Sequence, residues 1–180
     1  VDLLQRHFEV MRATLEPGSF SPDVVLWGET MLPIFMLAEP TRAQLAAEQQ
    51  WLHQNLAPLL QRRPAPELVV GVITVTLDGA GDEERRFNSA IHYDGDGRRR
   101  GIYHKTVLVP GGEYVPWIDR FPEETSRWLR EHILAMAGFL PDLTSGRGAV
   151  LFEVGSAPRT AGVAPTICFE VAYPHLWRAI

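Results

Sequence analysis

Three side chains that could carry out covalent chemistry stand at the ends of strand-like segments. They are Glu29 in DVVLWGE, Lys105 in GIYHK and Cys168 in APTIC, and Cys168 is the only cysteine among 180 residues. A cysteine reacts as its thiolate, and a nearby carboxylate can accept the thiol proton. A lysine beside both would keep the carboxylate ionised and stabilise a carbonyl oxygen under attack. The trio therefore predicts a thioester acyl-enzyme, which an amine or water can resolve.

Other interpretations of the cysteine stay open. A single cysteine often acts as a small buried hydrophobic residue, which would make the chain a non-catalytic binding or structural module. A Cys–His pair is a second alternative, with His92, His104 or His175 as the partner. We expect His104 to face away from Lys105, because adjacent strand residues point to opposite faces. We expect no metal site, because no Cys, His or acidic residues show ligand spacing.

The elements that must position the three residues follow an α/β order. Apolar periodicity predicts helices over residues 2–15, 41–60 and 123–139, and Thr41 with Gln44 forms a capping box. Strands are predicted at residues 23–27, 67–77, 86–93, 101–109, 148–154 and 162–168. The first is a continuous apolar run, typical of a strand buried on both faces, and DGDG at 94–97 predicts a hairpin. We expect a mixed sheet layered with helices, at whose strand ends the three residues can meet.

Composition narrows the class of protein. The length suits one domain, and a net charge of −5 without a long basic run argues against nucleic-acid binding. One cysteine excludes an internal disulfide framework. No apolar run reaches the length of about 18 residues that is typical of a membrane-spanning helix, and no signal peptide is visible.

Three motifs carry a resemblance to a known family. The segments VVLWGET, YHKTVLVPGGEYVPW and TICFEVAYPHLWR resemble the nitrilase superfamily of carbon–nitrogen hydrolases, and within it the apolipoprotein N-acyltransferases. The middle motif is the most specific, and the resemblance covers most of the chain. It implies a nitrilase-type α-β-β-α sandwich, of which residues 1–180 would be an incomplete part. The first strand, the C-terminal half and the membrane-spanning domain of a parent protein would be missing, so we expect residues 1–180 alone to fold poorly.

The resemblance also implies roles for individual residues. Glu29 would be the general base, Lys105 the oxyanion-stabilising lysine and Cys168 the nucleophile of a Glu-Lys-Cys triad. Glu113 and Glu170 match two further acids that the family needs near its active site.

Three positions depart from the family pattern. Phe169 stands where the family usually has Tyr, so any contact made through that hydroxyl is lost. Gly28 replaces a usual Pro, and Gly111 replaces a usual Phe.

The implied reaction is lipoprotein maturation in two steps. Cys168 would take a fatty acyl chain from a phospholipid, and the α-amine of a diacylglyceryl-cysteine lipoprotein would then attack the thioester. The resemblance implies no metal and no organic cofactor. The enzyme would lie in a bacterial inner membrane with its catalytic domain on the periplasmic side. Apolar residues of the following segment (Tyr114, Val115, Trp117 and Ile118) would either contact lipid or pack under their own loop. The alternative is a soluble amidase or nitrilase-type hydrolase with the same triad.

Overall fold

The computed structural model describes residues 22–56, 60, 64–137, 142–156 and 158–178, together with Arg6 and Glu9. The helix predicted over residues 2–15 therefore falls outside the described residues, apart from those two positions. None of the helices formed by the described residues has both the length and the apolar character that crossing a membrane requires.

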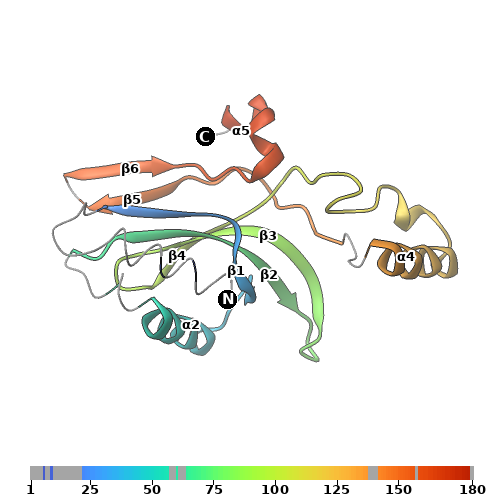
Figure 1. The fold of residues 1–180 in the computed structure, drawn as a ribbon, viewed down its shortest axis with the longest axis horizontal. Helices are drawn as coiled ribbons and strands as arrows, with labels where there is room; N and C mark the ends of the chain where they lie inside the picture. Colours follow the sequence, from blue (N-terminus) through green and yellow to red (C-terminus); the bar gives the residue numbers. More distant parts are fainter. Residues whose placement is uncertain are drawn as a thin grey trace.

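A four-stranded mixed sheet forms the centre of the molecule (Figure 1). Its strand order is β1-β2-β3-β4, with β1 parallel to β2 and the other neighbours antiparallel. A separate hairpin pairs β5 with β6. The strands are β1 (Val24–Leu37), β2 (Glu67–Leu77), β3 (Glu83–Tyr93), β4 (Arg99–His104), β5 (Phe152–Ser156) and β6 (Arg159–Val163). The α/β class with a mixed sheet, predicted from the sequence, is confirmed.

Three α-helices and two 3-10 helices complete the described elements. They are α2 (Arg42–Asn55), α4 (Glu123–Ala137), α5 (Pro174–Trp177), η1 (Ile118–Arg120) and η2 (Cys168–Ala172). The predicted capping box begins α2, where the Thr41 hydroxyl accepts from the Gln44 backbone N–H and the Gln44 side chain accepts from the Thr41 N–H. The predicted DGDG hairpin joins β3 to β4, and the Asp94 carboxylate accepts the N–H groups of Asp96 and Arg98 within that turn.

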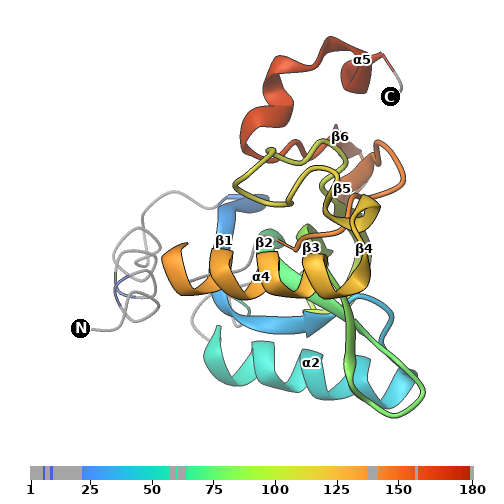
Figure 2. The same ribbon diagram turned by 90° about the vertical axis from the view of Figure 1, so that its right-hand side faces the viewer.

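The two faces of the sheet have separate cores, because side chains alternate along each strand. On one face, Leu52 of α2 and the C-cap residue Leu56 pack with Val70, Ile91 and Tyr93, and all five are at most 1% exposed. Burying one such leucine contributes about 1.5–3 kcal/mol. Figure 2 shows α2 below the sheet and the β5–β6 hairpin above it. The hairpin face is built by Phe152, Val154 and Ile167 with strand residues Val69, Ala90 and Tyr103. Helix, sheet and hairpin thus form three successive layers.

Buried polar contacts fix the outer layers to the sheet. Arg99 of β4 donates to the Glu48 carboxylate of α2 at 2.5 and 2.9 Å, and both side chains are at most 10% exposed. On the other face, Glu67 contacts His92 at 2.6 Å and accepts the Gly155 N–H at 2.9 Å, which ties the hairpin to β2 and β3. These contacts hold both layers in register with the central strands.

Three predicted strand boundaries near the candidate site are wrong. The strand predicted over residues 101–109 ends at His104, the last residue of β4. The first strand does not end before Glu29, because β1 continues to Leu37 after an irregular stretch. This strand, which stands at one edge of the four-stranded sheet, is also not buried on both faces, because Leu26 is 63% exposed. The last strand does not reach Cys168, since β6 ends at Val163. Pro165 follows two residues later and has no N–H for a sheet ladder.

Candidate active site

Glu29 lies in a bulge in the middle of β1. Trp27 pairs with Val70 and Leu32 pairs with Val72, so residues 28–31 face Gly71 alone. A Cβ on Gly71 would lie 2.1 Å from the Gly28 carbonyl oxygen, so only glycine permits this close approach. The bulge is also strained, because Thr30 has a φ of 49°, which a β-branched residue rarely adopts. The bulge, rather than a strand end, presents the Glu29 carboxylate.

Lys105 directly follows β4, as predicted, and its side chain is 1% exposed. Its backbone N–H donates to the Asn88 carbonyl at 2.8 Å, and its carbonyl accepts the Gly146 N–H at 2.8 Å. The ammonium group lies 2.8 and 2.9 Å from the two carboxylate oxygens of Glu113 and 4.0 Å from Oε1 of Glu29. The structure therefore pairs the lysine most closely with Glu113, the acid expected to have a supporting role.

Glu113 is held in its ionised form by several donors. Burial opposes its ionisation, but hydrogen bonds from Lys105, the Val109 N–H and Asn88 outweigh this effect, and the pKa of Glu113 is lowered. The Val109 N–H donates to Oε2 at 2.8 Å, so the carboxylate also stabilises the turn between Val109 and Glu113. Glu113 thus fixes the buried ammonium group and the loop that follows Lys105.

Asn88 joins the two acids, and it was not among the predicted site residues. Its side chain is 2% exposed, and its amide nitrogen lies 2.5 Å from Oε1 of Glu29 and 3.1 Å from Oε1 of Glu113. The signal for it in the sequence is an asparagine inside the strand RFNSAIHY, because asparagine is depleted in strands and a buried amide needs partners.

Cys168 is the first residue of η2, and its side chain is exposed. It lies between two buried anchors, Ile167 at 6% and Glu170 at 0% exposure. Its φ is 53°, which makes it one of three non-glycine residues with positive φ in the described part of the chain. Such strain costs about 1–3 kcal/mol and is concentrated at functional sites. The anchors and the strained backbone turn the thiol outward, so it is available for reaction.

Glu170 connects the segment after Cys168 with the segment after Lys105. Its Oε1 accepts the backbone N–H groups of Thr106 and Val107 at 2.7 and 3.0 Å, and its Oε2 accepts the Ile167 N–H at 2.9 Å. The Tyr103 hydroxyl also donates to Oε1 at 2.8 Å. Burial opposes ionisation of Glu170, but these donors outweigh it and its pKa is lowered. Burial, together with Glu170, raises the pKa of Tyr103 to about 12, so its hydroxyl remains a donor.

One cavity brings Glu29 and Cys168 together. It has a volume of about 260 Å³, and its lining includes Gly28, Glu29, Gly71 and Ala90 from the sheet and residues 163–168. Phe169 is 46% exposed, and its ring packs against that of Tyr173 in a T-shaped arrangement, with 5.3 Å between the ring centroids. The sequence therefore identified residues that share one region of the fold, with Asn88 added by the structure.

The three histidines considered as partners of the cysteine have other contacts. His92 contacts Glu67, and His175 packs against Tyr173 at 5.6 Å between ring centroids. His104 contacts the Ser89 hydroxyl at 2.7 Å, and burial lowers its pKa. Within the described ranges, no group of three His, Cys, Asp or Glu side chains is arranged to hold a metal ion.

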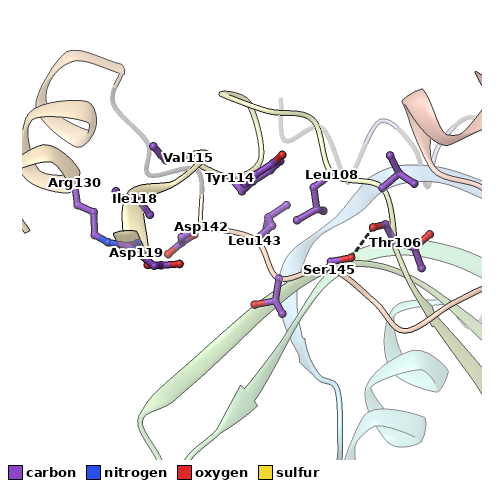
Figure 3. Close-up of a pocket in the computed structure, with 12 residues that line it drawn as sticks. Thr106, Leu108, Tyr114, Val115, Ile118, Asp119, Arg130, Asp142, Leu143 and Ser145 are labelled. Carbon is purple, nitrogen blue, oxygen red and sulfur yellow. Dashed lines mark hydrogen bonds and ion pairs between the residues drawn. The ribbon is translucent and has the colours of Figure 1, made fainter. Parts of the chain in front are cut away.

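A larger cavity of about 620 Å³ lies beside the loop that carries Glu113 (Figure 3). Leu108, Tyr114, Ile118 and Leu143 contribute apolar surface, and Arg130 with its ion-pair partner Asp119 lies at one end. Its lining also includes Thr106 and Val107, whose backbone N–H groups donate to the Glu170 carboxylate. It thus borders the region of the candidate site.

The apolar segment beside this cavity divides into buried and exposed residues. Ile118 is 4% exposed and packs under its own loop, whereas Trp117 is 70% exposed at a φ of 61°. Burial of Ile118 agrees with packing under the loop, and contact of the exposed Trp117 with lipid stays a prediction.

The chain is similar in sequence to several proteins named apolipoprotein N-acyltransferase. The apolipoprotein N-acyltransferase of Allorhizobium ampelinum is 28% identical over 178 residues, which cover 97% of this chain and 29% of that protein. That of Rhizobium meliloti is 28% identical over 171 residues, covering 95% of this chain and 28% of that protein. The chain thus spans less than a third of these relatives, and the resemblance predicted from the motifs is confirmed. No protein-family model matches the chain.

Solved amidases show a limited structural likeness. An amidase from Nesterenkonia sp. is 17% identical at a TM-score of 0.49, and the match covers 98% of this chain and 54% of the amidase. A variant of the Nesterenkonia AN1 amidase, from the nitrilase superfamily, is 16% identical at a TM-score of 0.48, covering 98% and 54%. An N-terminal amidase is 12% identical at a TM-score of 0.46, covering 90% and 34%.

Proposed function

We propose that the protein containing this chain transfers a fatty acyl chain from a phospholipid to the N-terminal α-amine of diacylglyceryl-cysteine lipoproteins. The observation that carries the proposal is that Glu29 and Cys168 line one cavity while the Lys105 ammonium lies 4.0 Å from the Glu29 carboxylate. The apolipoprotein N-acyltransferases that match almost the whole chain supply the choice of acyl transfer and of a lipoprotein acceptor.

The proposal includes the place of this chain in a longer protein. Because the chain covers 29% of the first relative, we place residues 1–180 within one nitrilase-like domain of a protein that also has membrane-spanning segments. That protein would lie in the bacterial inner membrane, with this domain on the periplasmic side. Both of its substrates, a phospholipid and a diacylated lipoprotein, are membrane-anchored, which agrees with this location.

In the first step Cys168 becomes acylated. Glu29 accepts the thiol proton, and the thiolate attacks the ester carbonyl of the phospholipid. The oxygen that becomes negative is stabilised by the positive charge of Lys105, which Glu113 holds in place at 2.8 Å. The ester C–O bond then breaks, the proton on Glu29 passes to the departing alkoxide, and a lysophospholipid leaves. The acyl chain remains on Cys168 as a thioester.

In the second step the acceptor amine attacks the thioester. Glu29 removes a proton from the attacking nitrogen, the C–S bond breaks, and an amide forms on the lipoprotein. The proton on Glu29 returns to the Cys168 thiolate, so the site begins the next cycle unchanged. The same two residues therefore act in both steps, which is why one cavity suffices.

We also propose that the cavity of about 620 Å³ accepts the acyl chain of the donor. Leu108, Tyr114, Val115 and Leu143 give it an apolar lining. Its border at Thr106 and Val107 is tied through Glu170 to the turn that begins with Cys168. An acyl chain held here would extend from the region of the thiol along the 106–119 segment.

The test uses the full-length protein in phospholipid vesicles with a synthetic diacylated lipopeptide. Wild type should attach a third acyl chain to the peptide amine, as measured by mass spectrometry, and should carry a thioester on Cys168. Cys168→Ala should lose both, whereas Val171→Ala should retain them, because Val171 is an exposed neighbour in the same turn. Acylation by Cys168→Ala at the wild-type rate would contradict the proposal. Release of ammonia from short amides without lipid would indicate a hydrolase instead.

A further inference from the structure

We propose that Asn88 is the positioning residue of this site, and that its amide NH₂ group holds the Glu29 carboxylate in place for proton transfer with Cys168. This inference rests on the proposed function and adds a residue to it. Asn88 is fixed in the interior of β3, where its backbone carbonyl accepts the Lys105 N–H at 2.8 Å. The same residue therefore has main-chain contact with the lysine and side-chain contact with both acids.

The direction of the amide follows from its neighbours. The amide nitrogen lies 2.5 Å from Oε1 of Glu29 and 3.1 Å from Oε1 of Glu113. Ionised carboxylates only accept hydrogen bonds, so the NH₂ group, and not the amide oxygen, must face them. The amide donates one of its two hydrogens to Glu29 and the other to Glu113. Asn88 therefore sets the separation between the general base and the carboxylate that binds Lys105.

Glu29 needs such a partner because its own backbone does not fix it. It stands in the strained bulge of an edge strand, its side chain is 36% exposed, and its distance to the Lys105 ammonium is 4.0 Å. Glu113, by contrast, is 14% exposed and has Lys105 and the Val109 N–H as further donors. Loss of the amide would therefore release Glu29 much more than Glu113.

The amide oxygen of Asn88 lacks the partners that its amide nitrogen has. Oδ1 of Asn88 is buried and has no hydrogen-bond partner among the described residues. A buried acceptor without a partner destabilises a fold, whereas the hydrogen bonds from the NH₂ group to the two carboxylates contribute stability. The side chain of Asn88 thus makes its described hydrogen bonds only toward the two acids, which agrees with a positioning role.

The experiment measures acylation of Cys168 in the full-length protein by p-nitrophenyl butyrate. Attack by the thiolate forms a butyryl thioester and releases p-nitrophenolate, which is followed by absorbance, and mass spectrometry assigns the thioester to Cys168. Four proteins form a double-mutant cycle: wild type, Asn88→Leu, Glu29→Gln and the double variant. We expect Asn88→Leu to acylate about 100-fold more slowly, because a misplacement of about 1 Å costs this much. Asn55→Leu, which removes a different asparagine hydrogen bond on α2, should leave the rate unchanged.

The double variant separates positioning from a structural role. If Asn88 acts through Glu29, Asn88→Leu should have no further effect on the acylation rate in the Glu29→Gln protein, measured at temperatures where all four proteins remain folded. An undiminished effect in the Glu29→Gln protein, or an Asn88→Leu rate equal to wild type, would overturn the inference, as would a wild type that forms no thioester at all. A wild type that forms the thioester but never acylates the lipopeptide would refute the proposed function and leave the role of Asn88 standing.

Discussion

Replacing Gly71 with alanine tests whether the β1 bulge positions Glu29. Gly71 pairs with Ala90 on one side, and on the other side faces the bulge formed by residues 28–31. The added Cβ would lie 2.1 Å from the Gly28 carbonyl oxygen and 2.8 Å from the Glu29 Cα. Side-chain carbons do not approach such atoms closer than 3.0 Å, so one of the two backbones must move.

The size of that movement sets the expected effect. Relieving the contact requires a shift of about 1 Å, and β2 is confined between β1 and β3 with its residues 68–72 buried. The bulge at the sheet edge is the part that can move, and it carries Glu29. A displacement of about 1 Å in a catalytic group lowers the rate about 100-fold. Overpacking of a buried strand also costs about 1–3 kcal/mol of unfolding free energy.

The assay compares Gly71→Ala with wild type for acylation of Cys168 by p-nitrophenyl butyrate, with the melting temperature measured in parallel. Gly79→Ala is the matched control, because a Cβ on Gly79 meets nothing within 4 Å. We expect Gly79→Ala to react like wild type and Gly71→Ala to react about 100-fold more slowly at temperatures where it remains folded. A folded Gly71→Ala protein with the wild-type rate would show that Glu29 does not need this bulge.

Three further predictions concern other parts of the site. Glu170→Gln should lower the unfolding free energy by about 2 kcal/mol, because charged hydrogen bonds are lost. Since the folded pKa values of Glu113 and Glu170 are lowered, their stabilisation is present above the unfolded pKa of about 4.3 and is lost as pH falls through the folded values. Acid unfolding of Glu170→Gln should therefore be shallower than that of wild type. Phe169→Tyr should change the unfolding free energy by less than about 0.5 kcal/mol, because the ring is 46% exposed, and a larger change in denaturant titration would contradict this. Val115→Asp should slow acylation of Cys168 by long-chain phospholipids but not by p-nitrophenyl butyrate, and equal slowing with both donors would argue against an acyl chain in the large cavity.

Much of the fold could be predicted because its signals are local. The strand over residues 67–77, the DGDG turn and the helix that begins after Thr41 each depend on neighbouring residues, and the structure has all three. The boundaries around Glu29 and Cys168 could not be predicted in the same way. At Glu29 the apolar run gave no sign that Gly71, 42 positions later, would allow a bulge. At Cys168 the run of small and apolar residues resembled a strand, although the pairing of β6 ends at Val163, two residues before Pro165.

In the candidate site, too, the residue types could be predicted from the sequence, whereas their contacts could not. The reactive types and the three motifs were sufficient to identify Glu29, Lys105 and Cys168 as candidates, because the chemistry of a side chain is a property of the residue itself. Their contacts were not determined locally. Pairing of Lys105 with Glu113, rather than most closely with Glu29, depends on the loop that returns after β4.

The sequence by itself therefore determined the α/β class, the resemblance and the candidate residues, because periodicity and motifs depend only on residues close together in the chain. Tertiary structure decided which strand would bulge, which acid would bind the lysine and why Asn88 belongs to the site. Asn88 lies 59 positions from Glu29 and 25 from Glu113, and only the pairing of β1, β2 and β3 brings its amide to both carboxylates. Hydrogen bonds over such separations depend on the packing of the whole sheet, which no local pattern of residues specifies.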